Sequence, residues 1–137
     1  MLRLLLYRHA KSDWADASLD DIDRPLNSRG RAAARAMAGY IASEKLLPDL
    51  ILCSTALRTR ETLSRLIPHL NRETDIRLRR DLYWQGDDVY STAIRTGGGT
   101  VQSLMIIGHN PATEGTAHEL IGSGPEDALR DLTAKYP

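Results

Sequence analysis

The chain has 137 residues, of which 42% are apolar, and this size and content suit one soluble globular domain with a buried core. Eighteen basic residues balance eighteen acidic ones, so the chain as a whole has no field that would hold nucleic acid or an anionic membrane. We therefore expect any bound anion to lie in a local pocket. Neither nucleic acid nor a membrane is an expected partner.

The cysteine content and the N-terminal segment indicate the compartment. Cys53 is the only cysteine, so an internal disulfide is impossible and a structural metal site is not expected. The apolar run at residues 1–7 is interrupted by Arg3 and is too short for a signal sequence or a membrane span. These features predict a protein of a reducing compartment, the cytoplasm.

The first third of the chain predicts a strand, a loop and a helix. Residues 2–7 form a short apolar run bounded by charge, which is typical of a buried central strand of a parallel sheet. Residues 10–27 are rich in aspartate and lack an apolar period, so we expect an extended surface loop. Asn27 is the predicted cap of a helix that runs through Ile41 and ends before Pro48.

The middle of the chain repeats the change from strand to helix. Residues 50–53 predict a buried strand, and Ser54-Thr55 can cap a helix over about residues 56–67. Residues 76–83 have a mixed pattern that could hold a weak strand.

The remaining segments predict two further helices and a strand. Asp87 can open a short helix that ends at the glycines of residues 97–99. Residues 104–107 are the third clear strand. Asn110 is the predicted N-cap and Pro111 the first residue of a helix to about Leu120.

Strands and helices thus alternate, which predicts an α/β fold of three layers, α/β/α, with a mostly parallel central sheet and helices on both faces. Ligands of such sheets bind outside the carboxyl ends of the strands. Polar residues follow each clear strand at that end: Arg8, His9, Ser54 with Arg58 one turn later, and His109.

Two histidines and two arginines at one edge could form a phosphate pocket. A neutral imidazole can attack phosphorus, and guanidinium groups can hold the oxygens of the phosphoryl group. The alternative is structural: Arg8 and Arg58 could pair with loop carboxylates, and the histidines could bond only to the backbone. The spacing alone leaves both interpretations open.

Four segments in order resemble the histidine phosphatase superfamily, the phosphoglycerate mutase-like enzymes. They are Leu5-Leu6-Tyr7-Arg8-His9-Ala10, Arg24-Pro25-Leu26-Asn27 before Arg29-Gly30, Ser54 through Arg58-Thr59 to Thr62, and Gly108-His109-Asn110-Pro111. The resemblance covers residue 3 to about residue 120. It implies a phosphoglycerate mutase-like fold.

The resemblance also implies catalytic roles. His9 would be the nucleophile that is transiently phosphorylated, Arg8 and Arg58 would clamp the phosphoryl oxygens, and His109 would donate a further hydrogen bond. Arg24 would line the entrance and contact substrate, although a solvated or carboxylate-paired arginine is an equal alternative. A backbone carbonyl that accepts from one nitrogen of His9 would leave the other unprotonated for attack.

Within the superfamily, the short chain most resembles the SixA-type phosphohistidine phosphatases. The resemblance implies hydrolysis of phosphohistidine on a partner protein. A small phosphomonoester as substrate, or a phosphate-binding module without turnover, are the alternatives. Mutase activity is not expected, because the chain lacks room for the substrate-enclosing insertions and lacks the acid.

The sequence departs from the family pattern in three places. Ala10 replaces the usual glycine after the nucleophile, a change that we expect to be tolerated. No glutamate lies in the segment 79–84 where relatives that cleave alkyl phosphates place their acid; Asp81 is the nearest candidate general acid, and a structural aspartate is the stronger alternative. The absent acid favours phosphohistidine, because an imidazole leaves more readily than an alkoxide.

The third departure is the tail, which stops where relatives continue into another strand. We expect residues 1–137 to form a single histidine phosphatase-like domain that lacks the usual C-terminal strand or is truncated. His69 and His118 do not follow strands and are expected to be structural or exposed. No cofactor and no catalytic metal are expected, because no close pair of ligands is present.

Overall fold

Four strands form one parallel sheet in the computed structural model, which describes residues 2–71, 73–84, 87–97, 99 and 101–121. The strands are β1 (Arg3–Arg8), β2 (Leu50–Ser54), β3 (Asp75–Arg79) and β4 (Ser103–Gly108). Their order across the sheet is β1-β4-β2-β3, and every neighbouring pair is parallel. The predicted parallel sheet is therefore confirmed.

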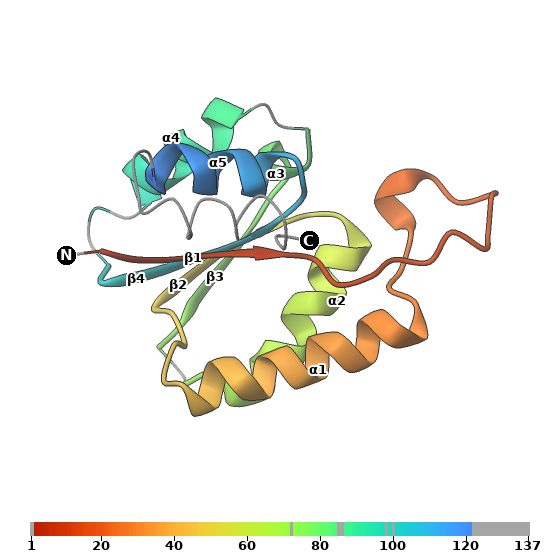
Figure 1. Cartoon of the computed structure of the whole chain (residues 1–137), viewed down its shortest axis with the longest axis horizontal. Helices are drawn as coiled ribbons and strands as arrows, with labels where there is room; N and C mark the ends of the chain where they lie inside the picture. The colour runs from red at the N-terminus through yellow and green to blue at the C-terminus, as the bar shows by residue number, and fades with distance from the viewer. Residues whose placement is uncertain (1, 72, 85–86, 98, 100, 122–137) are drawn as a thin grey trace.

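Helices cover both faces of this sheet. They are α1 (Ser28–Ser43), α2 (Leu57–Leu66), α3 (Asp81–Trp84), α4 (Asp87–Gly97) and α5 (Ala112–Ile121), with 3-10 turns η1 (Asp21–Asp23) and η2 (Ile67–His69). In Figure 1, α1 and α2 lie on one side of the strands, and α3, α4 and α5 lie on the other. This is the three-layer α/β/α architecture that the sequence predicts.

The two central strands, β2 and β4, supply both halves of the core. Because successive side chains of a strand point to opposite faces, each apolar run serves two helix layers. Ile51 and Cys53 belong to the cluster under α1 and α2, whereas Leu50 and Leu52 belong to the cluster under α4 and α5. Residues 104–107 of β4 divide in the same way, and all four are fully buried.

The prediction that residues 2–7 form the central strand is wrong for the described part of the chain. There β1 pairs only with β4 and lies at one edge of the sheet, and its side chains are mostly half-buried. An apolar run of six residues is compatible with a central or an edge strand, and strand order depends on the crossover connections. The tail that was expected to lack a strand lies in residues 122–137, outside the described residues.

The register brings three strand ends together. Arg8 is paired with Gly108, and Cys53 is paired with Ile107, so the residues that follow lie side by side at one edge of the sheet. The backbone N–H of His9 donates to the carbonyl of Gly108 at 3.1 Å. The sheet itself thus places the segment after β1 against the segment after β4.

The predicted helix starts differ in accuracy. The side chain of Asn27 accepts from the backbone N–H of Gly30 at 2.7 Å, so the cap of α1 is confirmed. The predicted cap by Ser54-Thr55 is wrong: the residue before α2 is Ala56, and no side chain caps this helix. Helix α5 begins at Ala112, one residue after Pro111, and the Asn110 side chain accepts from the N–H of Glu114.

The segment 10–27 is only partly the predicted surface loop. It folds back on itself through an antiparallel bridge between Ser12 and Leu26, and it contains η1. Leu26 is fully buried and Arg24 is 7% exposed. Figure 1 shows this segment projecting beyond the carboxyl end of β1.

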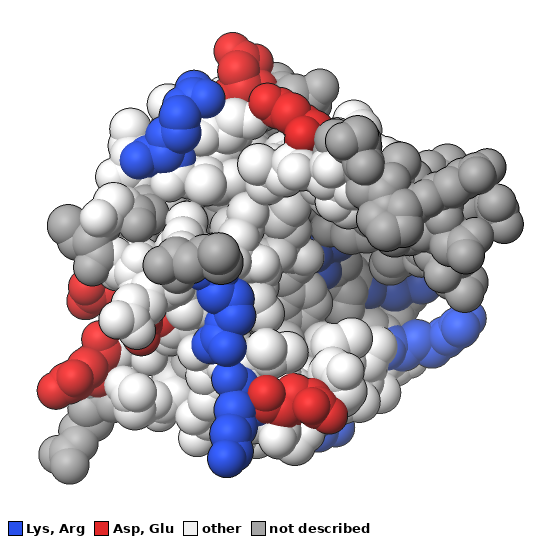
Figure 2. Space-filling model, turned by 60° about the vertical axis from the view of Figure 1, so that its left-hand side comes forward, with Lys and Arg blue, Asp and Glu red and all other residues white. Residues whose placement is uncertain are grey.

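Two surface observations complete the description. On the face shown in Figure 2, basic and acidic side chains lie among uncharged ones, and neither sign covers the surface. None of the described helices has the length and apolarity needed to cross a membrane.

Candidate active site

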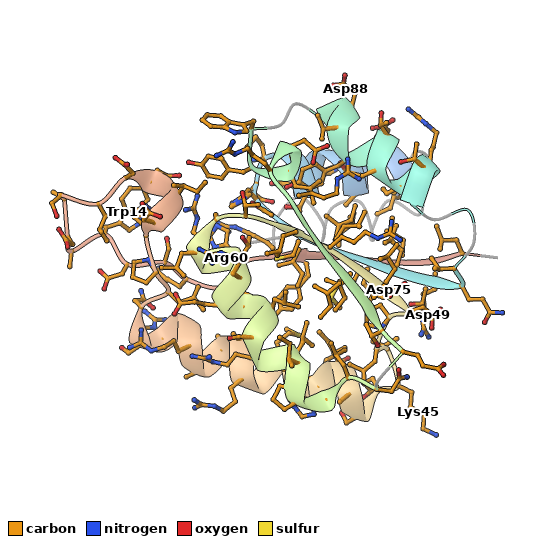
Figure 3. All side chains as sticks on the ribbon, turned by 180° about the vertical axis from the view of Figure 1, so that it is seen from behind. Trp14, Lys45, Asp49, Arg60, Asp75 and Asp88 are labelled. Carbon is orange, nitrogen blue, oxygen red and sulfur yellow. The ribbon has the colours of Figure 1, made fainter. Side chains whose placement is uncertain are left out.

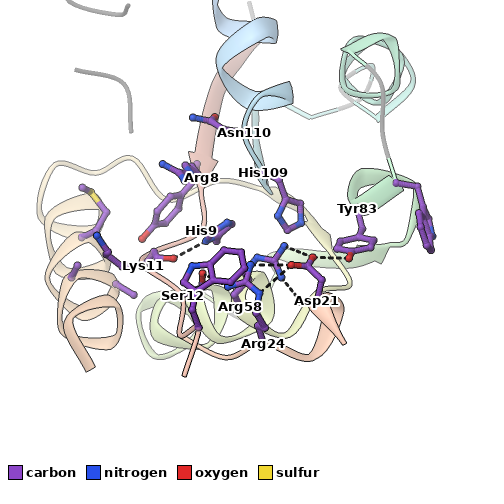
Figure 4. A pocket seen from close by; sticks show the side chains of 17 residues that line it. Arg8, His9, Lys11, Ser12, Asp21, Arg24, Arg58, Tyr83, His109 and Asn110 are labelled. Carbon is purple, nitrogen blue, oxygen red and sulfur yellow. Dashed lines mark hydrogen bonds and ion pairs between the residues drawn. The ribbon is translucent and has the colours of Figure 1, made fainter. Parts of the chain in front are cut away.

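A cavity of about 920 Å³ opens at the carboxyl ends of β1, β2 and β4. Its floor is formed by residues at or shortly after the strand ends, Arg8, His9, Arg58 and His109, and Ser54 bonds to His109. Its wall is formed by the loop segment 10–27, chiefly Trp14, Asp21 and Arg24, with Tyr83 and Trp84 of α3 opposite. Figure 4 shows the floor and the wall facing one space.

The ring of His9 is held in one tautomer. Its Nδ1 lies 2.6 Å from the carbonyl oxygen of Ala10, and because a carbonyl can only accept, Nδ1 carries the proton. Burial, together with the positive charges of Arg58 and Arg8, lowers the pKa of His9 to about 4. The ring is therefore neutral at pH 7, and its other nitrogen, Nε2, has a free electron pair.

The second histidine of the floor, His109, lies beside the first. The two ring centroids are 5.3 Å apart, and His109 is 5% exposed. Its Nε2 shares a hydrogen bond of 2.7 Å with the hydroxyl of Ser54. Burial, with the nearby charge of Arg58, lowers the pKa of His109 to about 3, so this ring is also neutral at pH 7.

Arg8 and Arg58 each have a buried guanidinium N–H group that is unpaired within the described structure. The Nε atoms of both are buried and have no hydrogen-bond partner within the described structure. A buried N–H of a charged group without a partner is costly, and a phosphoryl oxygen would satisfy it. Beside Nε2 of His9, this arrangement supplies a nucleophile and donors for the oxygens of one phosphoryl group.

Arg24 contacts three other residues of the wall, Ser12, Trp14 and Asp21. Its Nη1 donates to the Ser12 hydroxyl at 2.7 Å, and its Nε and Nη2 each lie 3.0 Å from Oδ1 of Asp21. The exposed indole of Trp14 lies over it, with 3.4 Å between the guanidinium carbon and the ring centroid. Figure 3 shows Trp14 on the projecting loop. Arg24 is thus carboxylate-paired, as one alternative held, and also lines the pocket.

Asp21 is the wall residue that bonds to Arg58 of the floor. Its Oδ2 accepts from Arg58 Nη2 at 3.0 Å and from the Tyr83 hydroxyl at 2.7 Å. Burial tends to raise the pKa of this carboxyl group, but the hydrogen bonds that it accepts outweigh burial and lower the pKa to about 2. Asp21 is therefore an anion at every pH at which the protein is expected to work.

Two glycines allow this packing. A Cβ on Gly30, in the first turn of α1, would lie 2.0 Å from the backbone oxygen of Lys11. A Cβ on Gly108 would lie 2.1 Å from the hydroxyl of Tyr90, which accepts from the N–H of His109 and donates to the carbonyl of Leu82. Glycine at these positions lets the wall and the floor approach their supporting helices.

The sequence and the fold were compared with known proteins. The family model described as "Histidine phosphatase superfamily (branch 1)" matches residues 4–83, which is more than half of the chain.

The chain belongs to the histidine phosphatase superfamily.

Relatives and solved structures agree with this assignment. An uncharacterized protein of Mycobacterium tuberculosis is 33% identical over 132 residues, which cover 95% of this chain and 80% of that protein. An uncharacterized chloroplastic protein of Arabidopsis thaliana is 34% identical over 130 residues, and the match spans 88% of this chain and 60% of that protein. The chain therefore spans 60% of the plant relative's length, which is less than two thirds.

Among solved structures, a protein assigned as the phosphohistidine phosphatase SixA of Agrobacterium tumefaciens superposes with a TM-score of 0.85 at 35% identity. The match covers 97% of this chain and 83% of that one. Within the superfamily, the chain is SixA-like.

The structure brings together most of the residues expected in this histidine phosphatase site. His9, Arg8, Arg58, His109 and Arg24 all line the pocket. The N–H of Ala10, the residue that replaces the family's glycine, donates to Thr62 Oγ1 at 3.2 Å.

Asp81, the candidate general acid, is not among the residues that line the pocket. Its carboxylate is ion-paired with Arg79 on the neighbouring strand, with Nε 3.0 Å from Oδ1. The structural alternative therefore describes Asp81. His69 is exposed on η2, and the Nε2 atom of His118 lies 3.8 Å from Glu114 on α5; neither lines the pocket.

Sequence reasoning missed two residues of the site, Asp21 and Tyr83. Ser54 was placed at the strand end with the other polar residues and was also interpreted as a helix cap; its hydroxyl bonds to His109. Asp21 was one of many loop aspartates, and Tyr83 was part of a weak strand. The one available signal for Asp21 was its position three residues before Arg24, a spacing at which the two side chains can meet.

The described residues contain no group of three or more histidine, cysteine, aspartate or glutamate side chains that could hold a metal ion. The basic residues that line the pocket are Arg8, Lys11, Arg24 and Arg58.

Proposed function

We propose that the chain is a phosphohistidine phosphatase that passes the phosphoryl group of a partner protein through His9 to water, without a metal ion or other cofactor. The observation that carries the proposal is the hydrogen bond from Nδ1 of His9 to the carbonyl of Ala10. It leaves Nε2 as a nucleophile in a pocket where the buried Nε atoms of Arg8 and Arg58 lack partners among the described residues.

The first step transfers the phosphoryl group to His9. Nε2 attacks phosphorus, the bond between phosphorus and the substrate nitrogen breaks, and its electron pair stays on the leaving imidazole. When the other nitrogen of that imidazole carries a proton, the ring leaves as a neutral molecule and needs no acid. The guanidinium groups stabilise the negative charge on the phosphoryl oxygens.

The second step hydrolyses phospho-His9. Water attacks phosphorus, the bond from phosphorus to Nε2 breaks, and inorganic phosphate leaves with the oxygen and both protons of the water. His9 returns as a neutral imidazole because Nδ1 keeps its proton. Nδ1 donates a hydrogen bond to the carbonyl oxygen of Ala10 in both steps. Neither step requires a proton to be stored on the pocket's own side chains.

The ionisation of the pocket favours a phosphoramidate over an alkyl phosphate. Asp21 is the one carboxyl group among the described lining residues, and its pKa of about 2 keeps it ionised. Burial and the bond to Asp21 raise the pKa of Tyr83, and His109 is neutral. An alkoxide leaving group would find neither a protonated carboxyl group nor a protonated imidazole among the described lining residues, whereas an imidazole leaving group does not need one.

The test compares phosphoramidate and ester substrates. The protein is incubated with a peptide that carries phosphohistidine, and with glycerol 1-phosphate, an alkyl ester, in the presence of a chelator. We expect phosphate release from the peptide with a kcat/KM at least about 100-fold above that for the ester, since a missing general acid costs about that much. Quenched samples should carry acid-labile phosphate on His9.

The matched control is His69→Ala, which removes an exposed histidine outside the pocket and should leave turnover unchanged. His9→Ala should abolish both turnover and labelling. Comparable rates on both substrates would favour a small phosphomonoester instead. Phosphate binding without turnover on either substrate would indicate a binding module.

A further inference from the structure

The carboxylate of Asp21 holds one edge of the Arg58 guanidinium group. Nη1 of Arg58 donates to the backbone carbonyl of Asp21 at 2.7 Å, and Nη2 donates to its Oδ2 at 3.0 Å. Figure 4 shows these bonds on the side of Arg58 that faces the wall. The same residue thus accepts from both terminal nitrogens of the arginine.

This pairing leaves the other edge of Arg58 for a ligand. A guanidinium group has five N–H donors in a planar fork, and two of them are taken by Asp21. The buried Nε of Arg58 has no partner within the described structure. Rotation of the group toward solvent would break two hydrogen bonds to Asp21, so the guanidinium group is held in its present orientation.

Asp21 is itself fixed from two other directions. Arg24 contacts its Oδ1 through Nε and Nη2, each at 3.0 Å, and Tyr83 donates to its Oδ2. These donors belong to the wall and to α3, whereas Arg58 belongs to α2. Asp21 therefore connects three separate segments around one carboxylate.

We propose that Asp21 is a positioning residue that holds the guanidinium group of Arg58 in place for contact with the phosphoryl group. The inference rests on the proposed function, because it assigns a role within the same phosphate pocket. Asp21 does not exchange a proton with the substrate: its carboxylate stays ionised, and it accepts hydrogen bonds from Arg24, Arg58 and Tyr83 of the protein.

A positioning carboxylate has two opposing effects on the pocket. It aligns Arg58, which speeds the transfer, and its negative charge reduces the attraction of the three arginines for phosphate. Replacing Asp21 with asparagine keeps the size of the side chain and removes the charge. Turnover should then fall while the affinity for inorganic phosphate is retained or increased.

The experiment measures both quantities on Asp21→Asn. We expect kcat on the phosphohistidine peptide to fall about 10- to 100-fold, the cost of a misaligned group. We expect the Kd for inorganic phosphate, measured by calorimetry, to decrease about 3-fold through the lost repulsion. Tyr83→Phe, which removes one donor to the same carboxylate, should lower kcat by a smaller factor in the same direction.

The matched control is Asp23→Asn, an exposed aspartate of the same 3-10 turn that does not line the pocket; it should match the wild type. Equal kcat in Asp21→Asn and the wild type would overturn the inference. So would a proportional loss of kcat and phosphate affinity, which indicates a merely structural role. Wild-type protein that binds phosphate without turnover would instead refute the proposed function.

Discussion

The floor and the wall of the pocket are built in different ways. The floor residues lie on or directly after strands β1, β2 and β4, or in the first turn of α2, so regular backbone bonds place them. The wall belongs to the loop segment 10–27, which is held together by hydrogen bonds and ion pairs between side chains such as Arg24 and Asp21. The floor supplies the reacting groups, and the wall orients and screens them.

The difference has a consequence for the effects of mutation. The sheet holds the backbone of the floor residues that lie at the strand ends, so the loss of one of their side chains leaves that backbone in place. Arg58 on α2 is also bonded to Asp21 of the wall. A wall residue is one of several mutual partners, so its loss is shared among them. We therefore expect large and local effects on chemistry from the floor, and smaller effects spread over binding and stability from the wall.

The strongest test of this comparison replaces one arginine of each region. Arg58→Ala removes donors to the phosphoryl oxygens, and we expect kcat/KM to fall about 100- to 1,000-fold. Arg24→Ala in the wall should cost about 10-fold, because its guanidinium acts mainly through Asp21. Arg60→Ala, an exposed arginine on the same helix as Arg58, is the control in this steady-state assay. Equal losses at Arg24 and Arg58 would erase the distinction.

A second test places a methyl group where the wall meets α1. Gly30→Ala brings a Cβ against the carbonyl of Lys11, and we expect the free energy of unfolding to fall by about 1–3 kcal/mol, the usual cost of overpacking. Gly39→Ala, in the same helix with open space around it, should raise stability by about 0.5–1 kcal/mol. Urea denaturation of both variants measures the difference. If the free energy of unfolding of Gly30→Ala equals that of the wild type, the wall can shift to make room for the methyl group.

The third test uses pH and concerns the floor alone. His9 and His109 have folded-state pKa values of about 4 and about 3, below the ordinary value of 6.5. At pH values between the folded-state and ordinary pKa values, the unfolded chain therefore binds more protons than the folded chain. The free energy of unfolding should therefore fall as the pH drops from 7 to 5, by about 2 kcal/mol for each histidine. Urea titrations at both pH values should show a smaller drop in His9→Asn, and an equal drop would contradict the buried neutral ring.

The smallest effect is expected at the outer end of the wall. Trp14→Ala removes the indole that covers Arg24, a contact worth about 0.5–1 kcal/mol, so we expect KM to rise about 2- to 5-fold with little change in kcat. Tyr40→Ala, an exposed aromatic residue of α1 outside the pocket, is the comparison variant in the same assay. A fall in kcat would mean that Trp14 acts on the phosphoryl transfer itself, as the floor residues are expected to do.

Local sequence patterns determined much of the fold and of the floor. Apolar runs at the positions of β2 and β4 predict buried strands because a buried strand must be apolar on both faces. Asn27 predicts the start of α1, because its side chain satisfies a helix N–H within the same turn. His9, Arg58 and His109 were found because parallel strands deliver their following residues to one edge.

Only the tertiary structure decided the strand order and the wall. β1 lies at an edge of the described sheet, although its apolar run resembles that of a central strand, because pairing depends on connections and not on composition. Asp21 meets Tyr83 across 62 positions of sequence, and Ser54 meets His109 across 55. A side chain that bonds to a distant segment leaves no periodic signal, which is why the residues that orient the pocket were visible only in the folded chain.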